Sequence, residues 1–239
     1  MYLSRRRESE QSIIHWARAL TRAALLTSGL LAAQAAQGQA SASVSIASEY
    51  SARGVSLSDG RPTPQLSVGY DFHQGWYAGA FAAPRVSLGE RTQANQLIAY
   101  GGFTDRLASG LSWEAGASST TFQGSADYNY REVFAGLASD HLSGRLYFSP
   151  SYYGFGGRTA YGELNAFHPL RERITLIGHI GLLHGLHNER DRVDLRLALG
   201  IDAGACNVQL AWLGSAGLGP GARSVGKPRA VAVSAAYSF

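Results

Sequence analysis

The chain ends with residues 230–239, AVAVSAAYSF, and this stretch is the clearest indication of the fold class. Apolar residues alternate there with small ones, the two-residue period of a β-strand, at Val231, Val233, Ala235, Tyr237 and Phe239. Chain ends usually fray, so a regular strand that continues to the last residue needs a neighbour that holds it. In a closed barrel the last strand pairs with the first and no free edge remains. The stretch therefore predicts a β-barrel.

The sequence before this stretch contains many segments of the same kind. Gly (29 residues) and Tyr (12 residues) are abundant, and almost no stretch has the 3.6-residue period of a helix. The expected segments are about ten residues long, as a tilted transmembrane strand requires. The predicted fold class is all-β, an antiparallel transmembrane β-barrel of about 12 strands, near 42–51, 62–72, 75–84, 94–104, 110–121, 128–139, 142–151, 158–168, 173–184, 190–202, 205–214 and 229–239.

Alternation by itself also fits a soluble β-sandwich or a lipocalin-type barrel. In residues 192–202, however, Arg192, Asp194 and Arg196 lie on the polar face in mid-strand, opposite a continuous apolar face. Alternation cannot say which of the two faces is inside. Charged positions of this kind favour a barrel whose apolar face contacts lipid.

The connections between the predicted strands favour the same interpretation. Connections after the odd-numbered strands are long, and those after the even-numbered strands are mostly tight turns. Bacterial outer-membrane barrels have short periplasmic turns, longer external loops and an even number of strands. We therefore expect the first strand to start in the periplasm, residues 215–228 to lie outside the cell, and the turn at 105–109 to lie in the periplasm.

The N-terminus resembles a secretory signal peptide. Five arginines precede or flank a short apolar run, AALLTSGLLAA (23–33), which is followed by small residues. The run is too short for a membrane helix. We expect a signal peptide at 1–40 and a barrel domain at 41–239, with cleavage after Ala35 or Ala40. The first 40 residues contain five of the 21 basic and two of the 17 acidic residues, which leaves 16 and 15, so nucleic-acid binding loses its electrostatic support.

The phase of the strands predicts which charged side chains point into the lumen, because charge that faces lipid is costly. Arg53, in the first external loop, is a further candidate. It either folds inward and narrows the pore, or belongs with Gly54 to a turn that requires a positive φ, which we favour. The predicted pore-lining residues are Glu49, Glu114, Glu132, Arg145, Glu163, Arg192, Asp194 and Arg196.

Catalytic and metal sites find little support. His141 and Ser143 have the spacing found in some outer-membrane lipid hydrolases, but they fall at a tight turn. His179, His184 and His187 lack a clear carboxylate or cysteine partner for a metal. We expect no enzymatic activity, no metal and no cofactor.

Residues 47–83, ASEYSARGVSLSDGRPTPQLSVGYDFHQGWYAGAFAA, resemble the opening of the TorF family of porins. The family begins with Tyr-x-x-Arg-Gly-x-Ser, here Tyr50 to Ser56, and continues with Gly-x-Tyr-Ala-Gly, here Gly75 to Gly79. Further similarity lies at 98–103, 120–137, 159–165 and the closing AYSF. Relatives tend to carry acidic residues in the strand at 94–104, where this chain has Asn95 and Gln96. The resemblance implies an outer-membrane channel.

The sequence therefore predicts an exported outer-membrane porin, a narrow passive channel for small hydrophilic solutes or ions. The alternative is a non-conducting structural or adhesive barrel whose external loops bind partners. We expect contact with outer-membrane lipid, and recognition of Tyr237 and Phe239 by the outer-membrane insertion machinery. The solute and the oligomeric state stay open.

Overall fold

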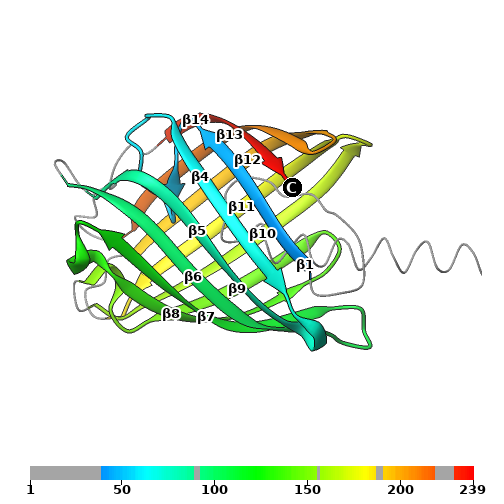
Figure 1. The fold of residues 1–239 in the computed structure, drawn as a ribbon, viewed down its shortest axis with the longest axis horizontal. Helices are drawn as coiled ribbons and strands as arrows, with labels where there is room; N and C mark the ends of the chain where they lie inside the picture. The colour runs from blue at the N-terminus through cyan, green and yellow to red at the C-terminus, as the bar shows by residue number, and fades with distance from the viewer. Residues whose placement is uncertain (1–38, 89–91, 155–156, 187–190, 219–228) are drawn as a thin grey trace, which may run out of the picture.

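A computed structural model describes residues 39–88, 92–154, 157–186, 191–218 and 229–239. The expected signal segment therefore lies outside the described residues, apart from Gln39 and Ala40. Twelve strands form one closed antiparallel barrel (Figure 1), in which each strand pairs with the next along the chain and the last pairs with the first. This confirms the predicted fold class. The barrel strands are β1 (Gln39–Ala47), β4 (Thr63–Asp71), β5 (Trp76–Ser87), β6 (Gln93–Arg106), β7 (Ser112–Gln123), β8 (Tyr130–Ala138), β9 (Leu142–Ser149), β10 (Thr159–Arg171), β11 (Ile174–Gly185), β12 (Asp191–Ala203), β13 (Cys206–Leu218) and β14 (Arg229–Ser238).

Each of the twelve predicted segments corresponds to one barrel strand, although several strands are longer than expected. β5 continues past a register shift between Ala83 and Val86, and β13 includes residues 215–218 of the predicted external loop. The rest of that loop, 219–228, lies outside the described residues. Two short strands, β2 (Ser51–Ala52) and β3 (Val55–Ser56), pair within the connection 48–62. The first strand was expected to continue to residue 51 and to be followed by a loop, whereas β1 ends at Ala47.

The terminal strand holds the barrel closed. Val44 of β1 pairs with Tyr237 of β14, and the amide of Phe239 donates to the carbonyl of Ala42 at 2.9 Å. The other edge of β14 pairs with β13 over Cys206 to Gly214. The end of the chain is thus hydrogen-bonded on both sides, which explains why its alternation continues to the last residue.

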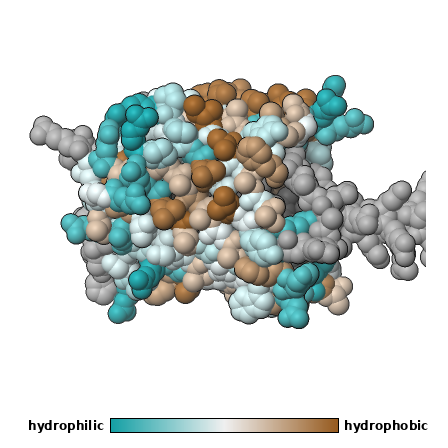
Figure 2. Space-filling model, in the orientation of Figure 1, coloured by the Kyte–Doolittle hydropathy of each residue, from teal (hydrophilic) through white to brown (hydrophobic). Residues whose placement is uncertain are grey.

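Apolar side chains form a band around the outside of the barrel. Figure 2 shows hydrophobic residues in the middle of one face and hydrophilic residues towards its left and right ends. On β12 the outward positions are 40–54% exposed at Leu195, Leu197, Leu199 and Ile201, and the intervening positions face the interior. Among the described residues no helix is long and apolar enough to cross a membrane.

Aromatic side chains gather at the end of the barrel that has the short turns. Tyr70 and Phe72 lie with ring centroids 4.7 Å apart, and Tyr237 and Phe239 lie 4.9 Å apart. Trp76, at the start of β5, packs 5.2 Å from the ring of Phe103. Most of these rings are well exposed. Such girdles are typical of the two interfaces of a membrane-spanning barrel.

The connection 48–62 folds into the opposite end of the barrel. Its Tyr50 and Leu57 are buried against inward-facing residues of β5, β6 and β7, including Phe81, Ile98 and Phe122. The amide of Leu57 donates to the carbonyl of Tyr50 at 2.7 Å, which closes the connection on itself. The interior at this end is therefore filled by the first long connection.

Candidate functional site: the barrel interior

The interior has two unlike walls. On β14, β1 and β4 the inward positions hold mostly small residues, as the register pairs Ser43 with both Ser67 and Ser238, and Ser41 with Gly69. On β7 to β12 the inward positions also include large aromatic and charged residues, among them Glu132, Arg145, Tyr147, Tyr161 and Asp194. The two walls thus differ in the size and charge of the side chains that they turn inward.

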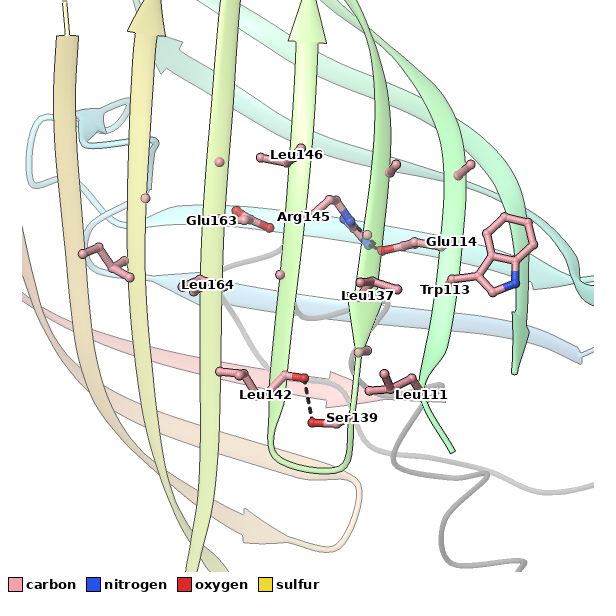
Figure 3. A pocket seen from close by; sticks show the side chains of 18 of the residues that line it. Leu111, Trp113, Glu114, Leu137, Ser139, Leu142, Arg145, Leu146, Glu163 and Leu164 are labelled. Carbon is pink, nitrogen blue, oxygen red and sulfur yellow. Dashed lines mark hydrogen bonds and ion pairs between the residues drawn. The ribbon is translucent and has the colours of Figure 1, made fainter. Parts of the chain in front are cut away.

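Arg145 and Glu114 form an ion pair on the wall of large side chains. Arg145 Nε donates to Glu114 Oε1 at 2.7 Å, and Tyr77 donates to Glu114 Oε2 at 3.0 Å. Arg145 also lies 4.9 Å from the ring centroid of Phe134. Figure 3 shows Arg145 extending towards Glu114. Both residues line a pocket of about 900 Å³ over β7 to β11, together with leucines such as Leu146. Leu146 is 71% exposed whereas Arg145 is 4% exposed, so neighbouring residues of β9 lie on opposite faces of the wall.

Arg53 lies inside the barrel, held by a carboxylate and three aromatic rings. Its Nη1 and Nη2 donate to the two carboxylate oxygens of Glu132 at 2.6 and 2.8 Å. The guanidinium carbon lies 4.4 Å from the ring centroid of Tyr161, 4.7 Å from that of Tyr147 and 5.2 Å from that of Tyr152. A bidentate ion pair combined with cation–π contacts is a strong combination when it is shielded from water.

The tip of the connection brings Arg53 to this position. Arg53 and Gly54 both have positive φ angles, 47° and 75°, in the turn between β2 and β3. A Cβ on Gly54 would come within 2.8 Å of Ser215 Cβ and 3.0 Å of Asp194 Cβ, so the tip packs directly on β12 and β13. Arg192 Nη1 donates to the carbonyl of Arg53 at 3.3 Å. Arg53 therefore folds inward, and it also forms a tight turn with Gly54. The two alternatives considered from the sequence occur together.

A second polar cluster lies next to the Arg53 site. His179 Nε2 is 2.8 Å from Asp194 Oδ1, and His179 Nδ1 is 2.7 Å from Asn165 Oδ1. Tyr161 donates to Asp194 at 3.3 Å, which links this cluster to the rings around Arg53. Arg196, the cross-strand neighbour of His179, donates to Gln209 of β13.

Two of the predicted lining residues, Glu163 and Glu49, accept hydrogen bonds from hydroxyl groups. Glu163 is buried and accepts a long hydrogen bond of 3.4 Å from Tyr147. Glu49 lies beyond the end of β1, whereas the sequence placed it within a strand. Its carboxylate accepts from Ser56 Oγ at 2.5 Å and from Ser58 Oγ at 3.3 Å, and thereby stabilises the connection 48–62.

Burial and the neighbouring charge shift the pKa of Arg53 in opposite directions. Burial alone would lower its pKa, but the Glu132 carboxylate and the surrounding tyrosines raise the pKa well above its ordinary value. Arg53 is therefore a permanent cation. The pKa of Tyr50 and that of Tyr152 are raised by burial, so both hydroxyls stay protonated at neutral pH.

His179 and His184, two of the candidate metal ligands, each contact a different carboxylate, whereas no clear carboxylate partner was expected from the sequence. His179 contacts Asp194 and Asn165, His184 contacts Asp191 at 2.8 Å, and His187 lies outside the described residues. No group of three potential metal ligands occurs in the described part of the chain. His141 lies in the turn before β9, and Ser143 is an inward residue of that strand.

The rings that surround Arg53 were not predicted from the sequence. Tyr147 and Tyr161 lie two residues from Arg145 and Glu163 respectively, so the same strand phase could have placed them in the interior. Tyr152 lies in the short turn Tyr152–Gly154, where no periodicity exists to indicate its direction.

These features define a closed, twelve-stranded antiparallel β-barrel with an apolar exterior and a charged, aromatic interior. The chain belongs to the family described as "Bacterial protein of unknown function (Gcw_chp)", whose model matches residues 32–228. That description does not mention TorF, so the resemblance to TorF stays a prediction. No curated protein matches the chain.

The barrel is similar to two solved structures of a porin, "KdgM porin in complex with disordered oligogalacturonate" and "KdgM porin". Each has 14% sequence identity and a TM-score of 0.56, and each match covers 83% of this chain and 99% of that chain. OprD of Pseudomonas aeruginosa also matches, with 11% identity, a TM-score of 0.38, and coverage of 83% of this chain and 65% of that chain. At 14% identity the similarity to KdgM shows the fold alone.

Proposed function

We propose that this protein is an outer-membrane porin, a narrow passive channel for small hydrophilic solutes or ions. The observation that carries the proposal is the distribution of side chains in a closed barrel, with an exposed apolar band outside and buried charges inside. An Arg side chain on the lipid-facing surface would destabilise the barrel by about 2–4 kcal/mol at the middle of the bilayer. A barrel that turns apolar side chains outward and charged ones inward is therefore stable in a membrane. The fold of KdgM and the resemblance to TorF support the same class.

The proposed passage runs beside the wall of small side chains. Eight inward or loop residues would set its electrostatics, and Arg53 would narrow it at the end with the long connections. Five of the eight are acidic and three are basic, and Arg53 adds a fourth cation. Several of these charges already pair with each other, so we expect weak ion selectivity. The proposed lining residues are Glu49, Glu114, Glu132, Arg145, Glu163, Arg192, Asp194 and Arg196.

The proposal also includes how the protein reaches its location. An N-terminal signal peptide would direct export, and the insertion machinery would read Tyr237 and Phe239 on the terminal strand. Both aromatic side chains are exposed, at 46% and 70%, beside the short turns. They are therefore accessible at the end of the barrel that we assign to the periplasm.

Conductance of the purified protein in a planar bilayer tests the channel. A matched pair of substitutions on β4 tests the route, because Ser67 faces the interior and the adjacent Val68 is 45% exposed on the outside. We expect small steps of constant conductance for the natural protein, a marked reduction for Ser67→Trp, and no change for Val68→Trp. Equal effects of both substitutions would contradict the proposed route.

Absence of conductance in folded protein would favour the non-conducting alternative. A specific feature gives that alternative weight, because the connection 48–62 fills the interior at one end. In that case the long connections would be the functional elements, as binding sites for partners.

A further inference from the structure

We infer that Glu132, Tyr147, Tyr152 and Tyr161 form a recognition site for guanidinium-bearing solutes, in which Arg53 is the resident occupant. We refer to these four residues as the Glu132 cage. The inference rests on the proposed channel function, because it concerns solutes that enter the barrel interior.

The shape of the cage matches a guanidinium group. Glu132 presents both carboxylate oxygens to two different nitrogens of Arg53, at 2.6 and 2.8 Å. A planar guanidinium satisfies this fork, whereas an ammonium group acts as a point charge and cannot. The three tyrosine rings, with centroids 4.4–5.2 Å from the guanidinium carbon, favour a weakly hydrated cation over a small metal ion.

The cage and its occupant belong to different parts of the fold. Glu132, Tyr147 and Tyr161 lie on the consecutive barrel strands β8, β9 and β10, and Tyr147 and Tyr161 are cross-strand neighbours. Arg53 comes from the tip of the connection 48–62, between the two-residue strands β2 and β3. Because the strand ladders hold Glu132, Tyr147 and Tyr161 independently of that tip, these three of the four cage residues would keep their places if the tip withdrew.

An empty cage would attract a replacement cation. With Arg53 in place, Glu132 is 5% exposed and Tyr161 is 2% exposed. Truncation of the Arg53 side chain alone therefore leaves a largely enclosed carboxylate without its partner. A buried charge without its partner is strongly unfavourable. A free solute that carries a guanidinium group would pair with the Glu132 carboxylate and remove this unfavourable state. In the natural protein such a solute would compete with Arg53 for the cage.

Chemical rescue tests this inference. The mature chain would be compared with the Arg53→Ala variant and with the double variant Arg53→Ala, Glu132→Gln, in the presence of millimolar guanidinium chloride or the same concentration of sodium chloride. The first measurement is the temperature at which the folded barrel unfolds, since a ligand that binds only the folded state stabilises it. The second is the potassium current in a planar bilayer. Arg53→Gln provides a second single variant if Arg53→Ala assembles poorly.

We expect guanidinium to raise the unfolding temperature of the Arg53→Ala variant and to reduce its current, with little effect on the natural protein. Replacing a charged acceptor by a neutral one weakens binding by roughly a factor of ten or more. The double variant should therefore need about tenfold more guanidinium to reach the same increase in unfolding temperature. Equal responses of all three proteins, or equal responses to guanidinium and sodium, would overturn the inference.

The two measurements separate this inference from the proposed function. If no variant conducts but guanidinium still stabilises the Arg53→Ala variant selectively, the cage is a binding site and the channel proposal fails. If all variants conduct and guanidinium has no selective effect, the channel proposal stands and the cage inference fails.

Discussion

Gly54→Ala is the substitution that best tests how the connection 48–62 is held inside the barrel. The added methyl group would lie 2.8 Å from Ser215 Cβ and 3.0 Å from Asp194 Cβ, and both neighbours belong to barrel strands that cannot move away easily. The φ angle of 75° adds a second cost, because this conformation is unfavourable for any residue with a Cβ. We expect the tip to leave its position while the barrel stays folded.

The size of the effect follows from two contributions. The left-handed conformation costs roughly 1–2 kcal/mol in a residue other than glycine, and overpacking costs about 1–3 kcal/mol. Gly204, in the turn between β12 and β13, is a matched control, because its φ is 68° and nothing lies within 4 Å of its added Cβ. Gly204→Ala therefore has only the conformational cost. Gly204→Ala does not act on the tip, whereas both costs act on it in Gly54→Ala. Together they amount to about 2–5 kcal/mol, which corresponds to a roughly 30- to 5000-fold change in the population of the displaced tip.

Hydrogen exchange of the peptide that spans 48–62 measures this population directly. The amide of Leu57 is hydrogen-bonded to Tyr50 within the connection and should exchange faster by about that factor in Gly54→Ala. Exchange in the barrel strands should stay slow in both variants, and 48–62 should be unaffected in Gly204→Ala. If 48–62 exchanges at the same rate in the two variants, close packing of Gly54 does not hold the tip.

Further outcomes follow from the proposed topology and lining. Reagents added to intact cells should label or cut residues 219–228 and leave the turn 107–111 untouched, and the reverse pattern would invert the proposed orientation. Deletion of Phe239 should sharply lower the amount of heat-modifiable, folded protein in the outer membrane, and normal assembly would exclude it as an insertion signal. Reversal potentials under a salt gradient should indicate at most a mild cation preference that declines as ionic strength increases, and strong anion selectivity would contradict the charge assignment.

Much of the barrel could be predicted from the sequence, because strand phase is a local property. The alternation in residues 192–202 places Leu195 outside and Asp194 inside without knowledge of the neighbouring strands, and the structure has that arrangement. The strand ends were harder to place. β13 continues through residues 215–218, because pairing with β12 extends as far as Asp191 and Leu218 and outweighs the effect of Gly217 in that segment.

The content of the interior depended on contacts between residues far apart in the chain. Glu132 was predicted from the sequence to line the pore, and Arg53 was a candidate for a constriction of it. They are 79 residues apart in the chain, and no local pattern indicates that their side chains meet. Their pairing depends on where the connection 48–62 folds, and its packing on Phe81 and Phe122 determines that position.

The sequence by itself thus determined the closed antiparallel barrel, its strands and its two faces, because a two-residue period and a strand at the chain end are encoded within a few residues. Only the tertiary structure decided that Arg53 enters the barrel and is enclosed by Glu132 and three tyrosines. The physical reason is that such a site is assembled across strands and one long connection, and its energy comes from desolvated contacts that exist only after the barrel has closed.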